Sequence, residues 1–276
     1  IYIANEQKVS DKLSLNYGLR LSTFSNIGAY TEKTYDEQDN VLTETAYESG
    51  EFYNNYYGLE PRVNATYLLN SSSSIKASYN RNLQYLHLLS NSNSGTPTDL
   101  WIASSPLVQP QIADQFAIGY FRNFKDNMYE FSFETYYKNL DNQVDFEDGG
   151  SAINNPDIES DLVFGIGRTY GAEFYLKKKK GDFTGWISYT LAKSERQFET
   201  INQGEWLSAR QDRTHDLSIV GMYQFTPRLT ASASFVYYTG DAVTLPVGKY
   251  FVDGSLVNLY GDRNSERMPD YHRMDL

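Results

Sequence analysis

The residues that could carry covalent or metal chemistry are few, and their spacing forms no catalytic or metal site. The three histidines, His87, His215 and His272, have no partner histidine at the spacing of a zinc site. Cysteine is absent, which excludes thiolate metal sites, thiol catalysis and disulfides. Serine is common, but no GxSxG motif or Ser–His–Asp arrangement can be assembled. We therefore predict no enzyme, no metal site and no cofactor.

A glycine-rich stretch, GIGRTYG, weakly resembles a phosphate-binding loop. It contains Gly165, Gly167 and Gly171. No βαβ pattern surrounds it, and such a loop needs one. Glycines inside a strand of a curved wall are the favoured interpretation.

Aromatic residues of the expected loops are candidates for ligand contact, because loop-borne aromatic rings make good anchors. The candidates are Tyr85, Trp101, Trp206, Tyr250 and Tyr260. The alternative, which the pattern favours, is an aromatic girdle or loops that pack on themselves.

Two acidic segments are candidates for attracting cationic substrates or a hard cation such as Ca²⁺. Their acidic residues are Glu32, Asp36, Glu37, Asp39, Glu44, Glu48 and Glu51 in the first segment, and Asp141, Asp145, Glu147, Asp148, Asp157, Glu159 and Asp161 in the second. The spacing matches no calcium loop, and a solvated loop surface is the favoured alternative.

Composition narrows the class of protein. The 276 residues include 24 Lys and Arg against 35 Asp and Glu, a net charge of −11, which argues against a nucleic-acid partner. No apolar run reaches the roughly 18–20 residues of a membrane helix. Aromatic residues make up 15% of the chain, more than a soluble core needs, and membrane interfaces favour tyrosine and tryptophan.

The elements that must position these residues are strands. In LSLNYGLRL (13–21), leucine and tyrosine alternate strictly with polar residues or glycine, and similar alternation follows along the chain. The alternating segments are 13–21, 57–69, 75–86, 128–138, 183–192 and 229–238, with weaker copies at 114–124, 168–178 and 213–225. Period two is the strand pattern, and about ten residues is the length of a tilted membrane strand. A large soluble β-protein with one wet face is the alternative.

The connections alternate between short and long, as in outer-membrane barrels, which have short periplasmic turns and long extracellular loops. Tight turns are expected at Asn70–Ser74, Asn123–Asn127, Lys179–Asp182 and Thr226–Arg228. Long loops are expected near 88–111, 140–166, 195–212 and 240–268. We therefore predict an all-β fold, a transmembrane antiparallel up-and-down β-barrel.

The polar face of each strand should line the lumen. The charged residues on that face are Arg20, Glu60, Arg62, Lys76, Glu130, Glu134, Lys138, Glu173 and Asp216. Their mixed sign suits a wet lumen or a wall in contact with a plug. Arg81 falls on the lipid face, where midplane exposure would cost about 2–4 kcal/mol, so we expect a bulge, a lumen position or an interface position there.

The pattern contains nine complete strands and two partial ones. Open edges in lipid leave backbone groups unpaired, and no signal peptide is present at the start. We therefore expect residues 1–276 to be one partial outer-membrane barrel domain, without the plug domain and the last strands.

Five stretches make the chain resemble the TonB-dependent outer-membrane receptors of the Bacteroidota. They lie at 74–91, 97–146, 168–196 (RTYGAEFYLKKKKGDFTGWISYTLAKSER), 204–225 (GEWLSARQDRTHDLSIVGMYQF) and 267–276 (RMPDYHRMDL). The resemblance implies part of a plugged barrel of about 22 strands in the outer membrane of a Gram-negative bacterium. It implies outer-membrane lipid, lipopolysaccharide and TonB as partners, TonB through an N-terminal part that this sequence lacks.

The function implied is energised uptake of a scarce ligand through the plugged barrel. The alternatives are a structural or partner-binding subunit of an outer-membrane complex, for example with a lipoprotein, and a passive porin. The substrate stays open among siderophore-iron, oligosaccharide, peptide and vitamin.

Overall fold

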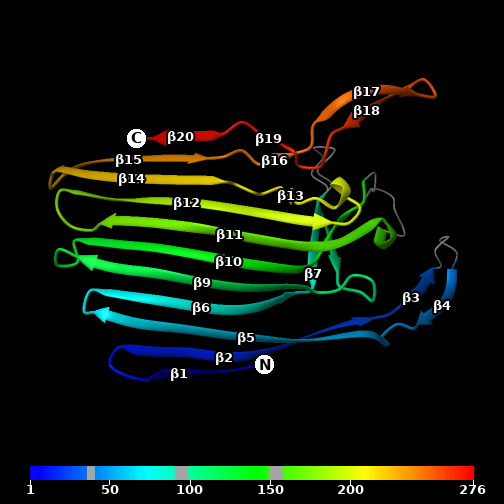
Figure 1. The fold of residues 1–276 in the computed structure, drawn as a ribbon, viewed down its shortest axis with the longest axis horizontal. Helices are drawn as coiled ribbons and strands as arrows, with labels where there is room; N and C mark the ends of the chain where they lie inside the picture. The colour runs from blue at the N-terminus through cyan, green and yellow to red at the C-terminus, as the bar shows by residue number, and fades with distance from the viewer. Residues whose placement is uncertain (36–40, 91–98, 149–157) are drawn as a thin grey trace.

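The computed structural model describes residues 1–35, 41–90, 99–148 and 158–276, and one antiparallel sheet dominates it (Figure 1). Its strands, in order across the sheet, are β1 (Tyr2–Lys8), β2 (Leu13–Ile27), β5 (Phe52–Asn70), β6 (Ser73–Gln84), β9 (Gln111–Phe124), β10 (Tyr129–Phe146), β11 (Leu162–Lys178), β12 (Phe183–Phe198), β14 (His215–Thr226), β15 (Leu229–Tyr238) and β20 (Tyr271–Asp275). Chain order equals spatial order, so the topology is up-and-down as predicted. Among the described residues, nine strands lie between the edge strands β1 and β20.

The tight turns gather at one end of the sheet and the long connections at the other (Figure 1). Each predicted tight turn is present, for example between Asn70 and Ser73 and between Thr226 and Leu229. Several strands run further toward the other end, here called the mouth, than the sequence predicts. β10 continues to Phe146 and pairs with β11 beyond the predicted membrane segment, because the two strands keep exchanging backbone hydrogen bonds after a bulge at Leu140–Gln143.

The long connections at the mouth contain strands and short helices that the alternation did not predict. They are the hairpins β3–β4 (Tyr30–Tyr35, Val41–Tyr47), β7–β8 (Leu86–Ser90, Asp99–Ala103) and β17–β18 (Pro246–Val252, Ser255–Tyr260), the pair β16–β19 (Ala242–Val243, Glu266–Arg267), the short strand β13 (Leu207–Ser208), and the 3₁₀ helices η1 (Ile158–Asp161) and η2 (Asn202–Gly204). No helix in the described part of the chain is long and apolar enough to cross a membrane.

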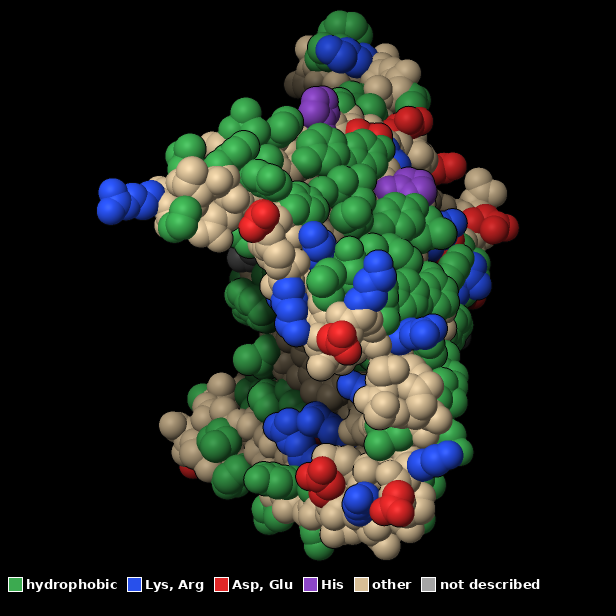
Figure 2. Space-filling view, turned by 90° about the vertical axis from the view of Figure 1, so that its left-hand side faces the viewer, with side chains coloured by type: hydrophobic (Ala, Val, Ile, Leu, Met, Phe, Trp, Pro, Cys, Tyr) green, Lys and Arg blue, Asp and Glu red, His purple; other side chains and the backbone are tan. Residues whose placement is uncertain are grey.

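The strand pairing groups the alternating apolar and polar side chains on two opposite faces of the sheet. Apolar side chains such as Leu59, Ile118 and Phe133 are exposed on one face. Cavities open on the other face, beside Lys76 and Glu134. Viewed from the tight-turn end, the wall curves around a hollow (Figure 2). The apolar face is therefore the outer one, and the polar face lines the lumen.

Two aromatic rows mark the limits of the apolar band on the outer face. The row nearer the mouth crosses β6, β9, β10 and β11 at Tyr79, Phe116, Tyr137 and Tyr170. Near the tight turns, Phe124 stacks on Tyr129 with ring centroids 5.0 Å apart. Tyr129 and Tyr137 are separated by about 27 Å along the strand, or about 20 Å across the membrane at the tilt of a barrel strand. This spacing approaches the height of a barrel's lipid-facing band.

Arg81 lies one residue pair beyond the mouth-side aromatic row and keeps its outward facing. Its Nη2 atom is 2.7 Å from the Asp114 carboxylate, and the pairing of β6 with β9 shows no bulge. The same outer row continues through Asn139 to Arg168 and Glu195. Arg81 is therefore neither bulged nor in the lumen, and it belongs to a polar row at the interface.

Pro61 marks a seam in the wall. The pairing of β5 with β6 stops at Arg62–Asn80, and Pro61 is the next residue of β5. Proline has no N–H to donate to a ladder, which explains why the pairing stops. Beyond this point the described parts of the following connection, residues 85–90 and 99–110, span the seam through side-chain bonds. The Tyr85 hydroxyl lies 2.8 Å from Ser22 Oγ, and the Tyr56 hydroxyl donates to the Ser105 carbonyl at 2.7 Å.

Candidate functional site

The inner wall carries the predicted lumen charges, and the first group is centred on Glu60. This carboxylate is only 3% exposed and lies 3.8 Å from the guanidinium of Arg20 and 3.8 Å from that of Arg62. Arg20 faces Glu60 directly across β2 and β5. The three predicted residues thus form one charge cluster with an excess positive charge.

Glu134, Glu173 and Asp216 form a row of carboxylates across the inner wall, here called the carboxylate row. Glu134 on β10 is directly opposite Glu173 on β11. Thr190 of β12 lies between Glu173 and Asp216 of β14. Like charges placed directly opposite each other destabilise a sheet. Among the described residues, no ion pair of 4 Å or less compensates any of the three.

The remaining predicted lumen charges have local partners. Lys76 Nζ lies 4.3 Å from the centre of the Phe121 ring. Glu130 forms an ion pair beside a tight turn, with its Oε2 atom 2.6 Å from Lys179 Nζ. Lys138 lies nearer the mouth.

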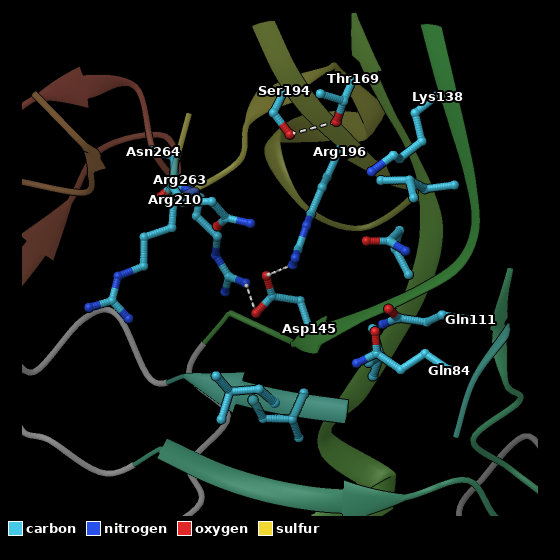
Figure 3. A pocket seen from close by; sticks show the side chains of 16 residues that line it. Gln84, Gln111, Lys138, Asp145, Thr169, Ser194, Arg196, Arg210, Arg263 and Asn264 are labelled. Atoms are coloured by element: carbon cyan, nitrogen blue, oxygen red, sulfur yellow. Dashed lines mark hydrogen bonds and ion pairs between the residues drawn. The ribbon is translucent and has the colours of Figure 1, made fainter. Parts of the chain in front are cut away.

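A cavity of about 630 Å³ opens at the mouth on the lumen side of β10, β11 and β12 (Figure 3). Its polar lining consists of Gln84, Gln111, Lys138, Gln143, Asp145, Thr169, Ser194, Arg196, Arg210, Gln211, Arg263 and Asn264. Four of these side chains are cationic and one is a carboxylate. The volume lies within the range of small-molecule pockets.

Glycine makes room for this cavity. The inner face of β11 carries Gly167 between Leu140 and Arg196 in the register, and Thr169 beside it. A Cβ atom at Gly165 would lie 2.1 Å from the Gln197 carbonyl oxygen. The GIGRTYG stretch is therefore a strand, as predicted, and its glycines permit close strand packing and leave space for the cavity.

Arg263 holds three mouth segments together and was not identified from the sequence. It is 7% exposed and donates to the Phe146 carbonyl at 2.7 Å and to Asp148 at 2.5 Å. Its backbone N–H donates to Asn202 Oδ1 at 2.8 Å, and Asn202 Nδ2 donates back to its carbonyl. No local spacing signals these contacts, because the partners lie 61 to 117 residues away in the chain.

A second buried ion pair has the same role. Asp212 is almost fully buried, pairs with Arg267 and accepts a bond of 2.6 Å from the Ser194 N–H. Arg267 also donates to the carbonyls of Asp212 and Gly240. The mouth connections are thus fixed to each other and to β12, which gives the cavity a defined lining.

The predicted ligand-contacting aromatics lie on separate elements. Tyr85 faces the lumen, where it stacks on Phe24 with ring centroids 5.2 Å apart. Trp206 lies over the Arg168 guanidinium at 4.0 Å, beside the outer polar row. Trp101 on β8, Tyr250 on β17 and Tyr260 on β18 are exposed on hairpins. As far as the described residues go, the cavity lining includes none of these five.

The acidic segments are described only in part, since Asp36, Glu37, Asp39 and Asp157 lie outside the described residues. Asp145 and Asp148 serve as partners of Arg263. The described residues contain no group of three or more His, Cys, Asp or Glu side chains placed to hold a metal ion.

The histidines have separate surroundings. His215 Nδ1 lies 2.8 Å from the Tyr189 hydroxyl, and His272 faces Tyr237 across β15 and β20. His87 is 1% exposed, and its Nε2 atom lies 2.9 Å from Ser104 Oγ.

The inward-facing charges, the outward apolar band and the mouth loops describe one side of a membrane barrel. Comparison with protein families agrees, since the model of the TonB dependent receptor-like β-barrel matches residues 1–276. The chain belongs to this family of TonB-dependent receptor barrels. The match confirms the predicted family, the outer-membrane location and the assignment to a receptor rather than an enzyme class, while a Bacteroidota origin stays a prediction.

Solved structures of TonB-dependent receptors share the fold. The siderophore receptor PiuA from Acinetobacter baumannii has a TM-score of 0.62 and 17% identity, covering 99% of this chain and 35% of its own. The pyoverdine receptor FpvA from Pseudomonas aeruginosa has a TM-score of 0.61 and 16% identity, covering 99% and 34%. The FrpB iron transporter from Neisseria meningitidis has a TM-score of 0.60 and 14% identity, covering 99% and 36%.

This chain therefore spans about a third of the length of these receptors. A search of curated proteins found no match.

Proposed function

We propose that this TonB-dependent receptor barrel takes up a scarce ligand by an energised route, with a plug domain inside its lumen. The chain would then be one partial barrel domain, 1–276, of a longer protein that also supplies the plug, the TonB-engaging segment and further strands. Its siderophore and iron receptor neighbours support uptake as the activity. Their low identity leaves the substrate of this chain open.

The carboxylate row carries this proposal. Glu134 and Glu173 repel each other across neighbouring strands, and the described residues offer them no cation within ion-pair distance. A wall that faced only water would gain nothing from this arrangement. Cationic side chains of a plug, placed against Glu134, Glu173 and Asp216, would turn the repulsion into attraction.

The test of plug contact uses the full-length receptor in planar lipid bilayers. Urea added to the wild type should open a conductance when the plug loosens. In Glu134→Gln/Glu173→Gln, the conductance should appear at a lower urea concentration. Glu130→Gln is the matched control, because Glu130 is paired with Lys179 and should leave the midpoint unchanged.

A conductance that is open without urea would instead favour a porin. Equal urea midpoints for the two glutamine variants and the wild type would contradict plug contact at the carboxylate row.

Energised uptake is tested by growth competition. Cells with the intact gene compete against cells without it in media limited for iron, for carbon or for vitamin B12, with and without TonB. The proposal expects an advantage in one medium that disappears when TonB is removed. An advantage that persists without TonB would favour a porin, and no advantage together with a stably co-purifying outer-membrane partner, such as a lipoprotein, would favour a structural subunit.

A further inference from the structure

We propose that the mouth cavity binds an anionic, oxygen-rich small molecule. This inference rests on the proposed function in one respect, since it names the chemical class of the ligand that the receptor admits. It is carried by two cationic side chains, Lys138 and Arg196, that face the cavity from the inner wall (Figure 3).

The charge of the cavity is opposite to that of the chain. The protein carries a net charge of −11, whereas the lining has four cations, Lys138, Arg196, Arg210 and Arg263, against the single carboxylate of Asp145. Charges of one sign that line a concave site focus the electric field and raise the local concentration of ions of the opposite sign. The cavity therefore favours anions although the molecule as a whole repels them.

The internal contacts leave part of this positive charge unused. Arg263 is committed to Phe146 and Asp148. Arg196 approaches Asp145 only to 3.7 Å, and 28% of its side chain is exposed. Lys138 makes no ion pair of 4 Å or less with any residue in the described part of the chain. Arg196 and Lys138 can therefore meet a ligand without breaking a strong contact.

Only small residues of β11 lie between these two cations. In the register, Lys138 is opposite Thr169, and Arg196 is opposite Gly167. A glycine and a threonine on β11 thus separate the two cationic side chains, so one small ligand can reach both. The Thr169 and Ser194 hydroxyls, 2.9 Å apart, and the amides of Gln84, Gln111 and Gln143 add neutral hydrogen-bonding groups around it.

A neutral ligand fits this arrangement less well. Covering Lys138 and Arg196 with an uncharged molecule would remove water from two cations without supplying a counter-charge, and desolvating an unpaired ion is costly. A carboxylate or phosphate oxygen compensates that cost, and arginine binds such groups through two parallel hydrogen bonds.

The test measures binding of citrate, a small polyanion, to the purified full-length receptor in detergent by calorimetry, with glucose as the neutral comparison. The wild type should bind citrate with an affinity that falls as salt is raised, and glucose should give no signal. Lys138→Gln/Arg196→Gln should weaken citrate binding at least tenfold, and Lys138→Gln alone by a smaller factor. Arg228→Gln, in a tight turn at the far end of the wall, is the matched control and should bind as the wild type does.

Assembly of every variant is checked by heat-modifiable gel mobility, and the single variant replaces the double one if the latter fails to assemble. Absence of citrate binding, equal binding by the variants and the wild type, or glucose binding of equal strength would overturn the inference. Such a result with TonB-dependent growth intact refutes only the ligand class. Loss of the TonB-dependent advantage with citrate binding intact refutes only the uptake function.

Discussion

Charged side chains at the mouth divide into those that bind each other and those that face the lumen. Arg263 and Arg267 are satisfied by carbonyls and carboxylates of other loops, so they fix the structure of the mouth. Lys138 and Arg196 point into the cavity with much of their charge unused. The same residue type thus serves stability in one place and recognition in the other, and only the partners distinguish the two roles.

His87 gives the mouth a pH dependence. Burial lowers the pKa of the His87 ring, so the folded β7–β8 hairpin favours the neutral ring. The unfolded hairpin binds a proton more readily, and folding stability therefore falls as the pH decreases through about 6.5, the ordinary value for histidine. Amide hydrogen exchange of 86–90 and 99–103, corrected for the intrinsic rate, should be faster at pH 5 than at pH 7.5.

The control for this prediction is His87→Asn, which keeps a polar group near Ser104 but does not titrate. It should remove the extra acceleration at acid pH. If His87→Asn and the wild type show the same pH dependence, another group is responsible.

At the scale of the strand, the facing of each residue determines its tolerance to charge. Phe133 lies on the outer face of β10 with 43% of its surface exposed, and its neighbour Ser132 lies on the inner face. Phe133→Arg should impair assembly by about 2–4 kcal/mol, the cost of arginine near the bilayer midplane. Ser132→Arg should assemble nearly as the wild type does, since its guanidinium reaches water.

Heat-modifiable gel mobility over a urea series measures the difference in assembly between the two variants. Equal impairment would contradict the assigned facing. The same logic predicts that Leu15→Arg impairs assembly far more than Asn16→Arg.

Alternation predicts the wall strands well, because the side chains of a strand between lipid and lumen must alternate every two residues. It also predicts that Glu60, Glu134 and Glu173 share one face of the sheet. It could not predict the mouth hairpins, whose residues pack on each other and need no fixed repeat. The cavity was missed for a related reason. Arg263 and Asp145 meet only after the loops fold together, and no local pattern encodes a contact across more than a hundred residues.

At the scale of the molecule, Arg263 couples loops that are otherwise independent. Arg263→Ala would remove its bonds to Phe146 and Asp148. Bonds to charged groups contribute about 1.5–3 kcal/mol each, so local opening of the loops should become at least about tenfold more frequent. Proteinase K should therefore cleave within 147–161 and 199–212 at least about tenfold faster, while the barrel wall stays resistant.

The control is Arg273→Ala, because Arg273 pairs with Asp275 on the same strand, far from the loops. It should leave the cleavage rate unchanged. Unchanged cleavage in Arg263→Ala would show that the loops hold together without it.

The interruption at Pro61 affects how the wall can respond to a bulky solute. Elsewhere in the described sheet, separating two strands means breaking a whole series of backbone bonds, but above Pro61 the join depends on contacts such as Tyr56–Ser105 and Tyr85–Ser22. Each neutral bond of this kind contributes only about 0.5–1.5 kcal/mol. We therefore expect the wall to widen more easily at this seam than between its other paired strands, whose backbone hydrogen bonds would stay intact.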